Sequence, residues 1–351
     1  MTHSVKPSRL FYPDFIRVTA FLCILLFHFQ VETSHYAGFF RGIPLFETGI
    51  HDIDLGQLGV SLFFILSGAS LMISKKPFHV ISFYKSRIRA LFPAFYLVWG
   101  GAFLGTLLLS PESLRGTPPW TIILTFLGLD GYVYSIYPNF YKIGEWFLGC
   151  LLLIYLVYPL LRTAIDRHPR ILLPFVLVIW ILCMKFIPTP FRPDHTFYLR
   201  IPEFLIGMYL MKYWNRHIYL QGFAGIFMCL FFLFHSPLPE NYQVICLAGT
   251  GIGVFMTLRA LACWIDSFAL PVLKTIVTEI SGISYEIFLL HHFVLIHMLR
   301  IFFADRSLSQ GEGFLLFTGW CLLIGVTAWI LHQFVALLLK KDIPFQRRHP
   351  L

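Results

Sequence analysis

The chain has 351 residues, of which 57% are apolar and only 13% are charged, and its formal net charge is +9. Soluble domains carry about 25% charged residues, so this composition argues against a soluble protein, and no polar stretch is long enough to form a separate soluble domain. The basic residues are scattered over the turns between apolar runs, which argues against a nucleic-acid partner. We expect one integral membrane domain over residues 1–351, with the lipid bilayer as its partner.

About ten apolar runs follow one another along the chain. A hydrocarbon core of about 30 Å needs about 20 mostly apolar residues per spanning helix. The apolar segment 120–134 is too short to span, so we expect it to be re-entrant or interfacial. The sequence therefore predicts an all-α, polytopic membrane bundle of about ten transmembrane helices, at residues 15–31, 57–73, 90–110, 145–162, 171–187, 200–213, 219–235, 243–262, 283–304 and 313–339.

The charge of the connections predicts how these helices cross the membrane. The first apolar run follows Lys6 and Arg9, and residues 31–36 lack the small-x-small cleavage pattern of a signal peptide, so we expect the run to remain as an anchor. Positive charge marks the cytoplasmic side of a membrane protein. Both termini are therefore expected in the cytoplasm, since basic residues gather on the connections that share a side with the N-terminus: Lys75, Lys76, Lys85, Arg87, Arg89, Arg162, Arg167, Arg170, Lys212, Arg216, Lys274, Lys340, Lys341, Arg347 and Arg348.

The first predicted span carries two ionisable residues, Arg17 and His28. Eleven residues separate them, so on a helix they lie about 20° apart on one face and about 16 Å apart along the axis. Asp14 is one turn before Arg17 and can pair with it. Arg17 could be an interfacial anchor and His28 a packed side chain. Because charged groups inside a membrane are costly, a pair on one face favours a functional role.

The connection after the second span holds Lys85, Arg87 and Arg89 within five residues, at the start of a helix on the cytoplasmic side. Such a cluster anchors a helix on the cytoplasmic side. Arginine forks also match the oxygens of phosphate groups, so the cluster is equally a candidate phosphate clamp.

The ninth span and the outer loops carry the remaining candidates. On the ninth span, Glu286 and His297 share a face, and His291 is placed to reach the interior of a bundle. The outer side collects polar groups that could hold a polar acceptor or could simply be solvated. Arg200 and Glu203 could instead pair with each other. These outer groups are His51, Asp52, Asp54, Glu145, Arg200 and Glu203.

The seven cysteines lie in or at the ends of apolar runs, and the sequence has no CxxC pair and no metal-ligand spacing. We expect packing residues, with neither a disulfide framework nor a metal site.

Five sequence motifs, in the order in which they follow one another along the chain, resemble those of acyltransferase family 3, a family of membrane proteins. The family's first helix carries Arg or Lys, ten residues, then His, as in Arg17 and His28. The stretch 58–68, LGVSLFFILSG, is similar to its second span. The other three matches are a basic motif from Arg87 to Pro93, Trp146-Phe147-Leu148 with Tyr155 and Pro159, and Ser284-Tyr285 to His291. Together they cover nearly the whole chain.

The chain departs from the family pattern at two places. Some members carry Glu five or six positions after the Trp, where this chain has Leu151 and Leu152. Glu145 is a candidate substitute for that acid. The arginines in Arg87-Ile88-Arg89 are spaced more tightly than in many members, which leaves open which arginine does what.

The resemblance implies that the protein transfers an acyl group, often acetyl, from acyl-coenzyme A to a carbohydrate in a bacterial inner membrane. Polyanionic coenzyme A would be the donor substrate, with no metal, and would match Arg17, Lys85, Arg87 and Arg89. His28 would activate the weakly nucleophilic hydroxyl as a general base or would carry the acyl group itself. The other candidate catalytic residues are Arg17, Asp14, Glu145 and His291.

Two rival functions remain open from the residues alone. Intramembrane Arg, Glu and His also line transport paths, so a transporter or flippase for a lipid-linked saccharide is the alternative. Transporters often show repeated halves, and no internal repeat is evident here. A membrane sensor without activity is a third option.

Overall fold

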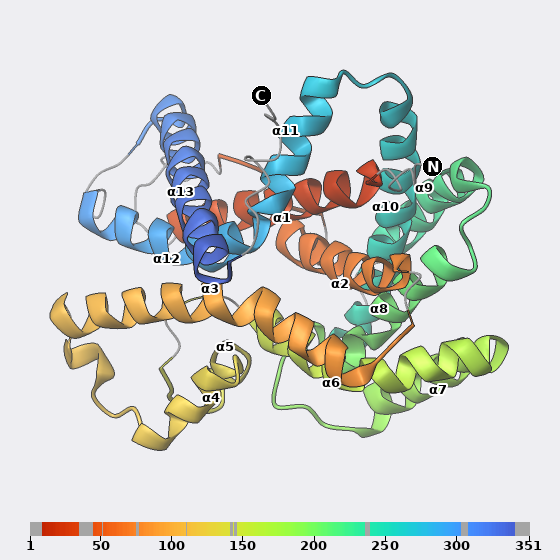
Figure 1. The fold of residues 1–351 in the computed structure, drawn as a ribbon, viewed down its shortest axis with the longest axis horizontal. Coiled ribbons are helices and arrows are strands. Elements are labelled where there is room, and N and C mark those ends of the chain that lie inside the picture. The colour runs from red at the N-terminus through yellow and green to blue at the C-terminus, as the bar shows by residue number, and fades with distance from the viewer. Residues whose placement is uncertain are drawn as a thin grey trace.

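The computed structural model describes residues 9–34, 45–50, 52–74, 77–109, 111–140, 143, 146–235, 239–302 and 308–340. Within these ranges the protein is built almost entirely of helices (Figure 1). The strands in these ranges are β1 (Gly49–Ile50) and β2 (Ile53–Asp54), which form a minimal antiparallel hairpin. The predicted all-α class is confirmed. The long helices are α1 (Phe11–Ser34), α2 (Leu55–Ile73), α3 (Val80–Leu109), α6 (Trp146–Arg167), α7 (Pro169–Phe186), α8 (Phe197–Lys212), α9 (Ile218–Phe234), α10 (Glu240–Phe268), α11 (Pro271–Gly282), α12 (Ser284–Phe302) and α13 (Gln310–Leu338).

Each of the ten predicted spans coincides with one of these helices. Seven are long and apolar enough to cross a membrane, and an eighth is added if α11 and α12, which meet at a 62° bend, count as one broken span. Helices α8 and α9 have 16 and 17 residues and are shorter. A polytopic helical bundle is thus what the described residues form, and the count of ten spans and the cytoplasmic termini stay predictions.

Helix α3 begins ten residues before the predicted span of 90–110. The sequence from Val80 to Arg89 contains neither Pro nor Gly, so the helix starts early and passes through Pro93 in its interior. Lys85, Arg87 and Arg89 therefore lie on the first turns of α3, which agrees with their predicted place at a helix start, whereas the helix itself begins ten residues earlier than predicted.

The apolar segment 120–134 folds into short helices. These are η3 (Pro119–Thr121), α4 (Ile122–Phe126) and α5 (Asp130–Val133), with a turn at Gly128, where φ is +69°. Trp120, Ile123 and Phe126 are exposed. Helices α4 and α5 lie beside the long helix α3 and are too short to cross a bilayer (Figure 1). The segment is therefore not a spanning helix, and its interfacial or re-entrant position stays a prediction.

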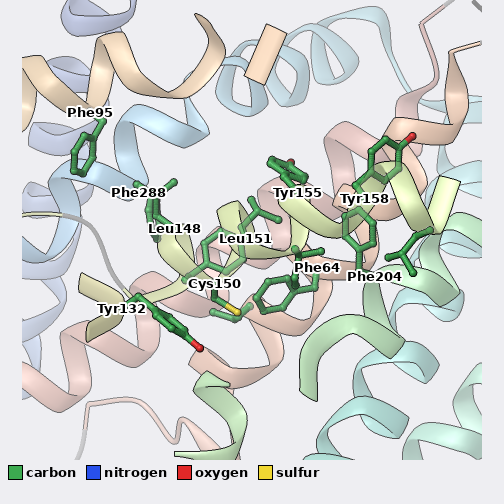
Figure 2. Packing of buried hydrophobic residues seen from close by; sticks show 14 of the residues in the cluster. Phe64, Phe95, Tyr132, Leu148, Cys150, Leu151, Tyr155, Tyr158, Phe204 and Phe288 are labelled. Carbon is green, nitrogen blue, oxygen red and sulfur yellow. The ribbon is translucent and has the colours of Figure 1, made fainter. Parts of the chain in front are cut away.

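Helix α1 lies at the centre of the bundle and packs against α2, α10, α11 and α12 (Figure 1). The largest apolar cluster joins α2, α3, α6, α8 and α12. Figure 2 shows part of it, in which Phe204 of α8 packs edge-on against Tyr155 and Tyr158 of α6. This cluster fixes α6 and α12 relative to α1.

Two glycines set the close approach of α2 and α8. A Cβ at Gly207 would overlap the carbonyl oxygen of Ile65, and a Cβ at Gly68 would overlap that of Phe204. Small residues let membrane helices approach in this way, and dispersion forces then hold the two backbones together.

The outer pair Arg200 and Glu203 is fully buried at the start of α8. Arg200 Nε lies 2.9 Å from Glu203 Oε2, and the hydroxyl of Ser61 donates to the other carboxylate oxygen at 2.5 Å. The pairing alternative for these two residues therefore holds in the structure. Both side chains contact α2 from α8, Glu203 through Ser61 and Arg200 over the ring of Phe64. Neither side chain lines the cavity that His28 lines.

We predict that Gly207→Ala lowers the free energy of unfolding by about 2–3 kcal/mol, because the added methyl group meets backbone that cannot move aside. The matched control is Gly100→Ala on α3, where nothing lies within 4 Å of the added Cβ. That variant should be neutral or slightly stabilising, since Ala favours helices by about 0.5–1 kcal/mol over Gly. Melting temperatures in one detergent measure the difference, and equal values for the two variants would contradict the close packing.

Candidate active site

The N-terminal part of α1 carries an ion-pair network that we call the arginine end. Asp14 is buried, and its Oδ1 accepts hydrogen bonds from Arg17 at 3.3 Å and from Ser281 at 2.7 Å. Arg17 also donates to the Ser281 hydroxyl at 2.7 Å. Arg9 completes the network with a 2.7 Å contact to Asp14. The predicted Asp14–Arg17 pair is therefore present, and it is fixed to α11 just before the α11–α12 bend.

The first turns of α3 approach the arginine end through Tyr155 of α6. The guanidinium of Arg87 lies 5.9 Å from the ring centre of Tyr155, and Tyr155 is also an electrostatic neighbour of Arg17. Lys85 and Arg89 are exposed on the other sides of α3. Of the basic cluster on α3, the structure thus brings Arg87 toward Arg17 and turns the other two cations away from it.

His28 lies near the other end of α1, which we call the histidine end. Its ring centre is 5.0 Å from that of His291 and 4.8 Å from that of His292, both on α12. His291 is fully buried, and its Nδ1 donates to the Phe288 carbonyl at 2.7 Å. Glu32, one turn after His28, places its Oε1 2.9 Å from His292 Nε2. Three imidazoles and a carboxylate therefore meet where α1 crosses α12.

A cavity of about 240 Å³ opens at the histidine end. Its floor is apolar and includes Phe147 and Phe288. Its polar wall comes from α1, α12, the start of α2 and the loop around η4 (Pro193–His195). The polar and aromatic groups that line it are His28, Glu32, Asp54, Gln57, Tyr134, Trp146, Arg192, Asp194, His195 and His292.

The η4 loop forms a rigid charged part of this wall. Asp194 accepts two hydrogen bonds from Arg192, at 3.1 and 3.2 Å, and one from Gln57 at 3.1 Å. The ring of His195 stacks on Trp146 with centres 4.0 Å apart. Burial would raise the pKa of Asp194, but the electrostatic influence of His195 and Arg192 outweighs burial, so this pKa lies below its ordinary value. Asp194 is thus a carboxylate at neutral pH.

Asp54 caps the start of α2 beside this loop. Its side chain accepts from the Gln57 backbone N–H at 2.7 Å, and the Gln57 side chain accepts in return from the Asp54 backbone N–H, which is a capping box. Burial raises the pKa of Asp54 above its ordinary value. Asp54 and Asp194 therefore offer the cavity two carboxyl groups of different acidity.

The structure places the predicted site residues at the two ends of the bundle. Asp14, Arg17 and Arg87 gather at the arginine end, whereas His28 and His291 meet at the histidine end. Lys85 and Arg89 belong to neither cluster. Glu145 and His51 lie outside the described residues, and Asp52 lines a second polar pocket that also contains Arg192 and Asp194.

Sequence reasoning missed Glu32, His292 and the η4 loop. The spacing of His28 and Glu32, four residues apart on one helix face, could have indicated Glu32. The adjacent pair His291-His292 could have indicated His292. Nothing in the stretch 192–195 marks it as a cavity wall, because only the tertiary fold brings that loop to the start of α2.

All seven cysteines are free thiols. Within the described ranges, no group of His, Cys, Asp and Glu side chains has an arrangement suited to a metal ion.

The comparisons with known proteins decide the family. Residues 10–333 match the profile of the acyltransferase domain of family 3, which is nearly the whole chain. The chain belongs to acyltransferase family 3. A search of curated protein sequences finds no significant match. The family match establishes a membrane acyltransferase and confirms the resemblance seen in the motifs, which span both ends of the bundle.

Helix α5 supports the cavity wall next to Tyr134, and its Asp130 is a source of pH-dependent stability. Asp130 is buried, and burial raises its pKa from 3.8 to about 6, although the backbone N–H of Gly131 donates to its side chain at 3.0 Å. A raised pKa in the folded state means that the protonated acid stabilises the fold fully below pH 3.8, and this contribution is lost as the pH rises through about 6.

We predict that Asp130→Asn stabilises the protein at pH 8 but has little effect at pH 4. The difference should approach about 3 kcal/mol, since each unit between the folded and unfolded pKa is worth about 1.4 kcal/mol. Asn keeps an acceptor for the Gly131 N–H. Melting temperatures of both proteins across this pH range test the prediction, and two curves that stay parallel would contradict it.

Proposed function

We propose that this acyltransferase moves an acyl group, in the simplest case acetyl, from acyl-coenzyme A to a hydroxyl of a cell-surface carbohydrate or its lipid-linked precursor. The observation that carries the proposal is the arrangement of α1. One helix fixes an arginine cluster at one end and, on the same face, presents His28 to a polar cavity at the other end. We place the protein in a bacterial inner membrane, with the arginine end facing the cytoplasm.

The arginine end suits the phosphates of coenzyme A. Arg17 is held in place by Asp14 and Ser281, yet 28% of its side chain is exposed, so part of the guanidinium can meet an anion. Arg87 approaches from α3 over the face of Tyr155. Arginine binds phosphate oxygens through paired hydrogen bonds, and a partly buried site strengthens them.

The acyl thioester must then travel from the arginine end to His28. The two sites are about 16 Å apart along α1, a gap that the extended pantetheine arm of coenzyme A can cover. The side chains on the way are aromatic: Tyr285 stacks on Phe288, and Phe288 packs edge-on against Phe147 at the floor of the cavity. Rotation of these rings would let a slender, uncharged arm pass while water stays out.

His28 activates the acceptor in this proposal. A sugar hydroxyl is a weak nucleophile, and a neutral imidazole raises its reactivity by taking the proton as the new C–O bond forms. The C–S bond of the thioester then breaks, and the proton passes from the imidazole to the departing sulfur. The alternative is a covalent acyl-histidine on His28 that the hydroxyl attacks in a second step.

The cavity wall suits a carbohydrate acceptor. The carboxylate of Asp194, the carboxyl of Asp54 and the Gln57 amide offer acceptors and donors to several hydroxyl groups. Trp146 adds an aromatic surface stacked on His195. A lipid-linked saccharide could also be carried by a transporter, but membership of an acyltransferase family favours chemistry at this site over transport through it.

We predict that His28→Ala lowers the rate of transfer by about 10²–10⁴-fold, the usual effect of losing a general base. The assay follows label from radioactive acetyl-coenzyme A into a glycan and glycolipid extract, with purified protein in nanodiscs. The matched control is His297→Ala, which removes a histidine of α12 that packs on Phe293 and does not line the cavity. Near-normal transfer by His28→Ala would refute the proposal, and so would wild-type protein that transports saccharide without releasing coenzyme A.

We predict that Arg87→Gln raises the KM for acetyl-coenzyme A by about tenfold, because it removes one phosphate contact worth about 1.5 kcal/mol. Arg89→Gln should raise it less, since that side chain is exposed away from Tyr155. The control is Arg170→Gln, an exposed arginine at the start of α7. The measurement is the KM for acetyl-coenzyme A at low salt, where electrostatic contacts are least screened. If neither the Arg87 nor the Arg170 variant changes this KM, the basic cluster on α3 only orients the helix in the membrane.

A further inference from the structure

We propose that Glu32 is a positioning residue for the transfer reaction and that it acts through His292. This inference rests on the proposed function, because it concerns how His28 is held and stabilised while it takes the acceptor's proton. It adds to that function a carboxylate–imidazole pair on two different helices.

The contact between Glu32 and His292 fixes the state of the second imidazole. An ionised carboxylate only accepts hydrogen bonds, so with Glu32 ionised the 2.9 Å contact places a proton on His292 Nε2. In the neutral ring the lone pair then lies on Nδ1. Both side chains are largely shielded, with 25% of His292 and 17% of Glu32 exposed, so the contact restrains the ring more than an open surface pair would.

His292 in turn restrains His28. Their ring centres lie 4.8 Å apart with an angle of 36° between the planes. His291 also packs against His28 at 5.0 Å and is itself fixed by its bond to the Phe288 carbonyl, and the His291 and His292 ring centres lie 6.1 Å apart. A ring packed against two such neighbours is restrained in its orientation, as a catalytic base requires.

The charge of Glu32 also matches the chemistry. When His28 takes the hydroxyl proton it becomes a cation in a poorly hydrated place. The hydrogen bond to the Glu32 carboxylate makes the His292 ring more electron-rich, and that ring lies 4.8 Å from His28, so the charge of Glu32 offsets the cation through His292. The hydroxyl loses its proton to His28, the C–O bond forms, the C–S bond breaks and the proton leaves on the coenzyme A sulfur. Glu32 and His292 return unchanged after each transfer.

The other ionisable groups around the cavity make contacts with residues other than His28 and His292. Asp54 caps α2, and Asp194 is held by Arg192 with His195 beside it. Tyr134 faces the cavity from the end of α5. On the remaining neighbour, α13, His332 pairs with Glu286 at 2.8 Å. That second carboxylate–imidazole pair joins α12 to α13 and does not line the cavity, so it provides a control of the same chemistry.

The experiment compares Glu32→Gln, Glu32→Asp, His292→Gln and the double variant Glu32→Gln/His292→Gln. Label from acetyl-coenzyme A is followed into the glycan and glycolipid extract. We expect Glu32→Gln to lower kcat by about 10-fold to 100-fold with the KM for acetyl-coenzyme A unchanged, because the donor binds at the arginine end. Glu32→Asp should recover part of kcat. The double variant should be no slower than His292→Gln alone, since a residue that acts through another has no further effect once that partner is gone.

The control His332→Gln removes the imidazole of the α12–α13 pair and should lower melting temperature without a selective fall in kcat. Additive losses in the Glu32 and His292 variants, or a normal kcat in Glu32→Gln, would overturn the inference while leaving the proposed function intact. If Glu32→Gln does not fold, Glu32→Asp is combined with His292→Gln in its place. A wild-type protein without His28-dependent transfer would instead refute the proposed function itself.

Discussion

An ionised side chain loses most of its hydration when it enters the hydrocarbon region of a membrane, and in a folded bundle it recovers that loss only through a partner. The intramembrane ionisable groups discussed above follow this constraint in pairs: Asp14 with Arg17, Arg200 with Glu203, Glu286 with His332, and Glu32 with His292. Asp14–Arg17 and Arg200–Glu203 each lie within one helix, and Ser281 and Ser61 connect them to a second helix. Glu286–His332 and Glu32–His292 each join two different helices. The positions of these pairs determine which helices can touch, and therefore where the chemistry can take place.

The pairs differ in what they leave available. Arg200 and Glu203 are fully buried, and the Ser61 hydroxyl of α2 donates to one oxygen of the Glu203 carboxylate, so this group serves the α2–α8 contact. Arg17 is restrained but remains partly exposed, and Glu32 with His292 lines a cavity. A buried pair contributes mainly to the specificity of packing, whereas a restrained and partly accessible pair can meet a ligand at low entropic cost. This distinction separates the structural pair Arg200–Glu203 from the two candidate functional pairs, Asp14–Arg17 and Glu32–His292.

The sequence predicted the helices and the α1 motif well, because both depend on local periodicity. Arg17 and His28 are eleven residues apart, and a helix of any context places them on one face. The start of α3 was wrong by ten residues, since apolar content marks the membrane core and not the helix that continues beyond it. Asp194 could not be found, because the η4 loop reaches the start of α2 only through the packing of α8 against α2. His292 was overlooked in favour of its neighbour His291, which contacts His28 as well but lies behind the cavity wall.

The separation of the two ends explains why one helix has to carry both motifs. A donor with several phosphates cannot enter the bundle, so its charged part must stay at a surface where arginines meet water. The acceptor hydroxyl needs a base in a place with little competing water, because water would take the acyl group in its stead. A rigid helix with a rise of about 1.5 Å per residue holds Arg17 and His28 at a fixed distance from each other, and a flexible pantetheine arm can span that distance. Any kink in α1 would change that distance. Accordingly, α1 runs unbroken from Phe11 to Ser34, with its Pro confined to the first turn, where the helix has no backbone hydrogen bond to lose.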